Sequence, residues 1–126
     1  SRALALRVLR AMITQVRPNE FAQWLQALPS QGLERALVLD VREPWELQTA
    51  SVQTDGFDVL HIPMREIPPR LGELPQDRPI AILCHHGVRS MQVAHFLAGH
   101  GFEQLVNIAG GIDAWSRERD ASVPEY

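Results

Sequence analysis

The residue best suited to chemistry is Cys84, which follows the apolar run Ile80–Leu83 and begins the loop Cys84-His-His-Gly-Val-Arg-Ser90. A helical pattern starts directly after this loop. The first N–H groups of a helix lack internal partners, and the helix dipole places partial positive charge there. Consecutive N–H groups in a tight turn also form a concave anion site. We therefore expect the Cys84 side chain to emerge into solvent, ringed by amide hydrogens that favour a nucleophilic thiolate.

The other residues of the loop are candidates for binding an anion attached to the sulfur. Arg89 offers a permanent charge and forked donors. His85 and His86 are either further donors, cationic near neutral pH, or exposed loop residues. The predicted binding loop consists of His85, His86, Gly87, Val88, Arg89 and Ser90. A lone cysteine is commonly a small buried core residue. The position at a strand end, before a glycine turn and an arginine, favours the functional interpretation.

Composition excludes several classes of site. With one cysteine, the chain cannot form an internal disulfide or a four-thiolate zinc site. A metal site built on Cys84, His85 and His86 fails because adjacent residues cannot all turn their side chains to one ion. We therefore expect no metal and no cofactor. All 12 basic residues are arginine, which excludes a Schiff-base or P-loop lysine.

Charge and hydropathy narrow the choice of partners. The net charge of −3 argues against a nucleic-acid partner, because such modules carry a basic face. The longest apolar run, Ile80–Cys84, is too short to span a membrane. The length of 126 residues predicts one domain. We assign residues 12–126 to it, and residues 1–11 to a basic N-terminal extension or to sequence added upstream of a protein that begins at Met12.

The apolar segments predict an α/β fold. Two of the strand-like segments are continuously apolar, as in strands buried on both faces of a parallel sheet. Helical patterns alternate with them, so helices should cover both faces of a mostly parallel five-stranded sheet. The expected strands are 13–16 at an edge, 36–39, 58–62, 80–83 and 105–108, and the expected helices are 21–28, 43–50, 68–74, 89–98 and 112–119.

In such folds the site lies at the carboxyl ends of the strands, which here points to Asp40, Cys84 and the segment Ala109-Gly110. The Asp40 carboxylate is expected either to orient loop N–H groups or Arg89, or to act as an N-cap for the helix 43–50. Both Trp45 and Trp115 are expected to pack in the core or at its rim.

Four motifs in this order resemble the rhodanese-type sulfurtransferase family. They are Leu39 to Glu43 with Trp45-Glu46, His61-Ile62-Pro63, the loop Cys84 to Arg89 with Ser90, and Gly110-Gly111 followed by Trp115. The resemblance covers about residues 12–124. It departs from the family pattern at 49–60, which is longer and less regular here. The likeness also implies a charge network that joins Arg42 and Glu46 to the loop, and the alternative is a solvated pair on the surface.

The resemblance implies sulfur transfer through a persulfide on Cys84. A small-molecule donor such as thiosulfate would supply the sulfur, and a thiol or cyanide would accept it, with a sulfur-carrier protein as a further candidate partner. Since the chemistry needs a reduced thiol, we expect a cytoplasmic location.

Two alternatives remain open on the sequence. A cysteine-dependent phosphatase of the same fold has one more residue in its loop, whereas four residues separate Cys84 from Arg89, and Leu83 stands where such a phosphatase usually has histidine. A non-enzymatic rhodanese-like module for sulfur sensing or partner binding commonly loses the cysteine, which this chain keeps.

Overall fold

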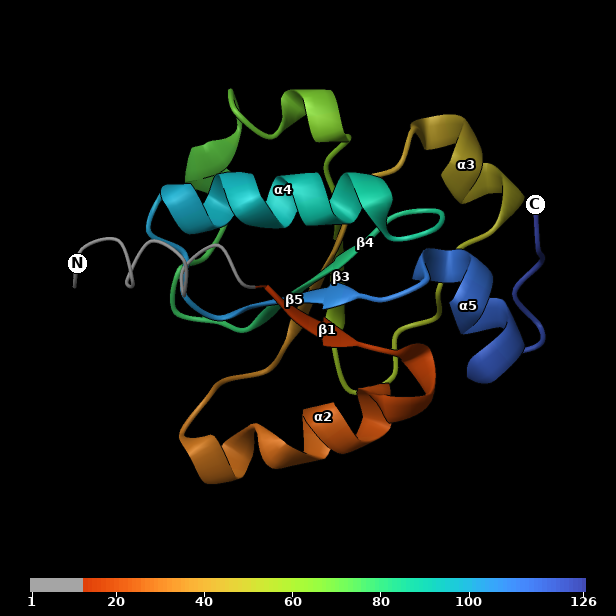
Figure 1. Ribbon diagram of the computed structural model, residues 1–126, viewed down its shortest axis with the longest axis horizontal. Helices are drawn as coiled ribbons and strands as arrows, with labels where there is room; N and C mark the ends of the chain where they lie inside the picture. Colours follow the sequence, from red (N-terminus) through yellow and green to blue (C-terminus); the bar gives the residue numbers. More distant parts are fainter. Residues whose placement is uncertain (1–12) are drawn as a thin grey trace, which may run out of the picture.

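The computed structural model describes residues 13–126, so the segment 1–11 assigned to a basic extension lies outside the described residues. Five strands form one sheet in the order β1-β5-β4-β2-β3, and every neighbouring pair is parallel. Helices lie on both sides of the sheet (Figure 1). The predicted α/β class and strand number are confirmed. The strands are β1 (Thr14–Val16), β2 (Leu37–Asp40), β3 (Asp58–His61), β4 (Ile80–Leu83) and β5 (Leu105–Ile108).

The burial of the inner strands explains why their segments stand out in the sequence as apolar runs. Every residue of β2, β4 and β5 is buried, as expected for strands covered on both faces. The edge strand β3 is partly exposed. Strand β2 begins one residue later than expected and includes Asp40, which pairs in register with Leu83. Asp40 therefore ends its strand level with the residue that precedes Cys84.

Four of the five expected helices form, and one prediction is wrong. The segment 68–74 contains only a 3-10 turn at Leu71–Glu73, preceded by another at Met64–Glu66. The backbone leaves the helical region at Arg70, with φ −110° and ψ 18°, and is extended at Leu74, as expected for a residue that precedes proline. The helices are α2 (Phe21–Ala27), α3 (Pro44–Thr49), α4 (Val88–Gly99) and α5 (Gly111–Glu118).

The sheet separates two apolar clusters. On one face, Val38 and its neighbours pack with Phe21 of α2 and Trp115 of α5. On the other face, Leu39 packs with residues of α4 such as Leu97. In Figure 1, α4 and α2 accordingly lie on opposite sides of the sheet. Since alternate residues of a strand point to opposite faces, one apolar run supplies both clusters.

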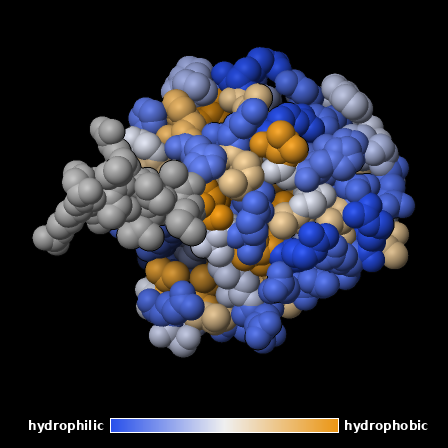
Figure 2. All heavy atoms as spheres, viewed as in Figure 1, coloured by the Kyte–Doolittle hydropathy of each residue, from blue (hydrophilic) through white to orange (hydrophobic). Residues whose placement is uncertain are grey.

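The face of the molecule drawn in Figure 2 is mainly polar. On the face seen in Figure 2, hydrophilic residues cover most of the area outside the grey segment, and the hydrophobic groups are small and separated. The large apolar side chains that stay exposed include Trp45 and Val88, near the amino ends of α3 and α4. Within residues 13–126, no helix is long and apolar enough to cross a membrane.

Candidate active site

The Cys84 sulfur lies inside the loop that follows β4. Its Sγ accepts hydrogen bonds from the N–H groups of Gly87 at 3.0 Å and Ser90 at 3.3 Å. The hydroxyl of Ser90 lies 3.2 Å from the same sulfur. The sulfur therefore faces the amide groups of the loop, as the sequence predicts.

The expectation that Cys84 emerges into solvent is wrong. The residue is 1% exposed, and it packs with Ile82 and Val93 in the cluster beneath α4. Cys84 continues the side-chain alternation of β4, which directs it to the same face as Ile82. The thiol thus lies between the apolar core and the polar loop, and a reagent must approach it from the loop.

Helix α5 holds the loop from behind. The N–H of Ile112 donates to the carbonyl of Cys84 at 2.9 Å, and the N–H of Asp113 donates to the carbonyl of His85 at 3.1 Å. A Cβ at Gly111 would lie only 2.3 Å from the carbonyl oxygen of His85 and 2.5 Å from that of Cys84. The close approach of the two backbones therefore requires glycine at position 111. Because carbonyl and N–H point in opposite directions across a peptide, the N–H groups of His85 and His86 point away from α5.

Arg89 does not offer its donors to the loop. Its two terminal nitrogens bind the two carboxylate oxygens of Glu46, at 2.8 Å and 2.9 Å. The hydrogen bonds from Arg89 hold the pKa of Glu46 down to about 2, and the same pairing raises the pKa of Arg89. The forked donors expected at Arg89 are therefore used on a buried carboxylate of α3, which neutralises the charge of the guanidinium.

Asp40 binds neither the loop N–H groups nor Arg89. Its carboxylate takes two hydrogen bonds from the guanidinium of Arg42, at 2.9 Å and 2.8 Å, and another from the Arg42 N–H. The alternative role as helix cap is also wrong, since Glu43 occupies the N-cap of α3 and forms a capping box with Glu46. Both members of the Asp40–Arg42 pair are buried, which explains their mutual charge compensation.

Arg42 and Glu46 join one network, as the resemblance implied. The Arg42 guanidinium donates to the backbone carbonyl of Glu46 at 3.2 Å. Glu46 in turn binds Arg89, which lies in the first turn of α4 beside the loop. The network carries two acids and two arginines, so the charges of Asp40, Arg42, Glu46 and Arg89 cancel.

Tyr126 is a member of the site that sequence reasoning missed. Its hydroxyl accepts a hydrogen bond from Arg42 at 3.0 Å and donates one to Glu46 at 2.8 Å. Its ring stacks on that of His85 with 3.8 Å between centroids and 3° between planes. Burial raises the pKa of Tyr126 to about 12. No local pattern marks this residue, because it lies beyond α5 and outside every motif.

The two histidines of the loop are stacked rather than spread around the sulfur. The rings of His85 and His86 lie 3.8 Å apart, and Tyr126 covers the other face of His85. Burial, together with the nearby His86, lowers the pKa of His85, which disfavours the cation expected near neutral pH. His86 is exposed.

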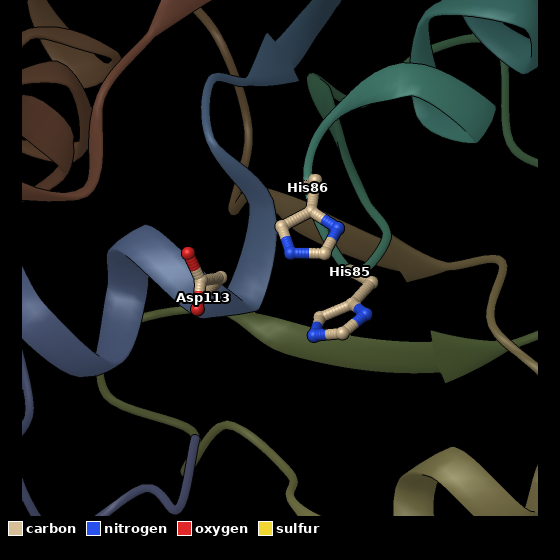
Figure 3. A group of neighbouring side chains, drawn as sticks. All are labelled: His85, His86 and Asp113. Carbon is tan, nitrogen blue, oxygen red and sulfur yellow. The ribbon is translucent and has the colours of Figure 1, made fainter. Parts of the chain in front are cut away.

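Within residues 13–126, one group of side chains has the residue types of a metal site. The ligand atoms of His85, His86 and Asp113 lie within 4.8 Å of one another, and Figure 3 shows Asp113 of α5 beside the two rings. The rings are inclined by only 30°, so their nitrogen lone pairs run side by side instead of converging on one ion. Asp113 is also bound by Arg117. This arrangement does not fit a metal ion, and Cys84 is not part of it.

The two tryptophans differ in placement. Trp115 is buried in the cluster beneath α5, whereas Trp45 is 61% exposed and meets Tyr126 edge to face at the rim of the site. Both therefore pack against aromatic neighbours, and the described part of the chain shows neither in contact with the sulfur. The site is thus a buried thiol held by amide donors, with a charge-neutral network beside it.

Comparison with known proteins supports this description. Residues 18–118 match the rhodanese-like domain family. The chain is 38% identical over 84 residues to a sulfurtransferase of Allochromatium vinosum, covering 67% of this chain and 75% of that protein. It is 28% identical over 84 residues to the thiosulfate sulfurtransferase GlpE of Vibrio cholerae, covering 67% and 76%.

A solved structure shows the same fold. The rhodanese-related protein of Thermoplasma volcanium superposes with a TM-score of 0.68 at 29% identity, covering 84% of this chain and 93% of that one. The family match spans the helices α2 to α5 and the strands β2 to β5, and it includes Cys84, Arg89 and the Gly110-Gly111 pair. The chain therefore belongs to the rhodanese-like sulfurtransferase family.

Proposed function

We propose that the protein transfers sulfane sulfur from thiosulfate, or a similar small donor, to a thiol or cyanide acceptor through a persulfide on Cys84. The observation that carries this proposal is the pair of N–H groups, from Gly87 and Ser90, that donate to Sγ. Amide donors aimed at a sulfur stabilise the thiolate that must attack and the anion that forms.

In the first step, the Cys84 thiolate attacks the outer sulfur of thiosulfate. A bond forms between the two sulfurs, the donor's S–S bond breaks, and the electron pair leaves with sulfite. Cysteine now carries a terminal anionic sulfur, and the total charge is unchanged. The N–H groups of residues 85–90, two of which already bind Sγ, are the donors that we expect to bind that terminal sulfur.

In the second step, an external nucleophile attacks the terminal sulfur of the persulfide. The bond to Sγ breaks, and the Cys84 thiolate returns. A thiolate acceptor leaves as a persulfide, and cyanide leaves as thiocyanate. Since the sequence holds one cysteine, no second thiol of the chain can attack the persulfide and form an internal disulfide. The acceptor is therefore a small thiol or a sulfur-carrier protein, and the two half-reactions predict ping-pong kinetics.

The residues of the site constrain the identity of the sulfur donor less than that of the acceptor. The four charged side chains of the network cancel, so the site offers a dianion amide hydrogens rather than a free guanidinium. Support for thiosulfate comes from the named activity of the Vibrio relative. Because turnover needs a reduced thiol, we also propose that the protein works in the cytoplasm.

The test is mass spectrometry of the intact protein after thiosulfate treatment. We expect an increase by the mass of one sulfur atom, removed by cyanide or dithiothreitol and absent in Cys84→Ser. A folded wild-type protein that gains no sulfur would contradict the proposal. Steady-state kinetics with thiosulfate and mercaptopyruvate then compare donors, and p-nitrophenyl phosphate should not be hydrolysed.

The burial of Cys84 favours a second candidate, a non-enzymatic module that senses sulfur or binds a partner. The thiol is 1% exposed, and the neighbouring Arg89 is already paired with Glu46. Both features restrict the access of a large acceptor to the sulfur. Such a module would form the persulfide but show negligible turnover with every acceptor. The same kinetic comparison separates it from the transferase.

A further inference from the structure

Asn107 is a polar residue in the middle of the buried strand β5. Its neighbours Val106 and Ile108 pack beneath the sheet, so the Asn107 side chain points to the α4 face, and the residue is 1% exposed. Its Nδ2 donates to Oε1 of Gln15, the register neighbour on β1, at 2.8 Å. The same nitrogen donates to the carbonyl oxygen of Gly87 at 3.3 Å. A buried amide therefore connects the sheet to the loop around Cys84.

The contact with Gly87 fixes which way the amide points. A carbonyl oxygen can only accept, so the atom of Asn107 that faces it must be the nitrogen. Within the described chain, the Oδ1 of Asn107 then has no hydrogen-bond partner. A buried acceptor without a partner destabilises a fold, and an apolar residue in this strand would avoid that loss. Stability alone therefore does not explain an amide at position 107.

Gly87 makes two contacts at the sulfur site, one through its N–H and one through its carbonyl. Its N–H donates to Sγ of Cys84 at 3.0 Å, while its carbonyl receives the Asn107 amide. Its backbone is left-handed, with φ 98°, and a Cβ there would lie 3.1 Å from the backbone nitrogen of Gly110. A glycine in this conformation has wide freedom unless neighbouring contacts fix it. The Asn107 amide supplies such a contact.

Asn107 also completes a set of contacts around the loop. Helix α5 takes the carbonyls of Cys84 and His85, and Asn107 takes the carbonyl of Gly87. These contacts fix three peptides of the loop on either side of Gly87, whose N–H binds the sulfur. The helix supplies its grip through its backbone, whereas the contact at Gly87 depends on one side chain.

We propose that Asn107 is a positioning residue for Cys84: its amide holds the Gly87 carbonyl so that the Gly87 N–H stays directed at the sulfur. Asn107 does not touch the reacting atoms. It acts through the backbone angles of Gly87, because the carbonyl that it binds and the N–H that faces the sulfur belong to successive peptides joined at the Gly87 Cα. The part concerning the thiolate stands on geometry alone. The part concerning the persulfide rests on the proposed function.

The test is the pH dependence of Cys84 alkylation by iodoacetamide. Asn107→Leu keeps the size of the side chain and removes the donor, and Asn107→Asp places an oxygen against the Gly87 carbonyl. We expect the alkylation midpoint to rise by about half a pH unit or more in the leucine variant, and further in the aspartate variant. Thermal denaturation of each variant is measured alongside, because leucine removes the unpartnered oxygen and also the donor to Gly87 and Gln15.

The matched control is Gln15→Ala, which removes the other partner of Nδ2 and leaves the contact with Gly87. Its alkylation midpoint should equal that of the wild type. An unchanged midpoint in Asn107→Leu would overturn the proposal, whatever happens to stability, because a merely structural amide has no reason to affect the thiol.

Alkylation needs no sulfur donor, so this test is separate from that of the proposed function. If the midpoint rises in Asn107→Leu but the wild type forms no persulfide, Asn107 positions the thiol and the sulfurtransferase proposal fails. If the wild type forms the persulfide and the midpoint is unchanged, the role of Asn107 fails and sulfur transfer stands.

Discussion

At the scale of single residues, the Glu46 side chain connects the loop, helix α3 and Tyr126 through its hydrogen bonds. It binds Arg89 with both oxygens, accepts the N–H of Glu43 in the capping box of α3, and receives the hydroxyl of Tyr126. Its charge neutralises the one arginine of the loop. Stability and reactivity are therefore opposed at this position, because a neutral residue would weaken the network and free a cation beside the thiol.

Replacing Glu46 with glutamine tests that opposition. We expect Glu46→Gln to lower the free energy of unfolding by about 1–2 kcal/mol at neutral pH, a range reduced for the partial exposure of Arg89. Arg89 would then be free to attract an anion, so the KM for thiosulfate should fall. Urea denaturation and steady-state kinetics measure the two effects. A stable variant with an unchanged KM would show that the ion pair restrains nothing.

The stability difference should depend on pH. Arg89 lowers the pKa of Glu46 from 4.5 to about 2 on folding, so the unfolded chain takes up this proton first as pH falls. The stabilisation by the carboxylate is therefore complete above pH 4.5 and is lost as the pH falls toward 2. Urea midpoints of wild type and Glu46→Gln should converge through this window. A constant gap would place the effect of the substitution elsewhere.

At the scale of secondary-structure elements, the site is built where β4, α4 and α5 meet. Strand β4 delivers the thiol, α4 begins at the residues that donate to it, and the first turn of α5 holds the carbonyls of the loop. The N-terminal amides of α5 are therefore used on protein rather than on a ligand. This makes the contact between α5 and the loop a determinant of the reactivity of the thiol.

Substituting Gly111 tests the contact between α5 and the loop. A Cβ there would overlap the carbonyls of His85 and Cys84, and the backbone is left-handed with φ 62°. We expect Gly111→Ala to cost at least about 2 kcal/mol of stability and to reduce sulfur transfer by about tenfold or more. Thermal denaturation and turnover with thiosulfate and cyanide measure the two losses.

The control for that substitution is Gly99→Ala. Gly99 ends α4 without a left-handed backbone, and a Cβ at this position would meet no atom of another element within 4 Å. Alanine there should leave turnover unchanged and raise stability by about 0.5–1 kcal/mol. Full activity in Gly111→Ala would mean that the loop does not need the close approach of α5.

Elements could be predicted from the sequence wherever the signal was local. The apolar runs of β2 and β4 indicated strands buried on both faces, and the glycine turn after Cys84 placed the start of a helix at the thiol. Prediction failed at 68–74, where the backbone leaves the helical region at Arg70 and is extended at Leu74, before Pro75. It also failed for the partners of Asp40 and Arg89, since which charges meet depends on side-chain directions that no local pattern records.

At the scale of the whole molecule, the last segment of the chain closes the network. Val123 is buried against the cluster beneath α5, and the hydroxyl of Ser116 donates to its carbonyl. The segment thereby brings Tyr126 to Arg42, Glu46 and His85. Tyr126 lies 84 positions from Arg42 and 80 positions from Glu46 in the sequence. No local pattern could therefore predict that these side chains meet at one site.

The imidazole of His85 reports whether this closure holds in solution. Burial, which the ring of Tyr126 helps to provide, lowers the pKa of His85 below 6.5, with His86 acting in the same direction. Tyr126→Ala should expose the ring and move the pKa of His85 upward, whereas Tyr126→Phe keeps the stack and should leave the pKa nearly unchanged. NMR titration of the histidine side chains measures all three proteins.

Linkage gives this closure a second signature. With a lowered pKa in the folded state, His85 takes up its proton more readily after unfolding, so it lowers stability as the pH falls through 6.5. That loss should be smaller in Tyr126→Ala than in Tyr126→Phe, because solvent reaches the imidazole in the alanine variant. Equal titration and equal acid sensitivity in both variants would mean that Tyr126 does not cover His85 in solution, and the last segment would then have no part in the site.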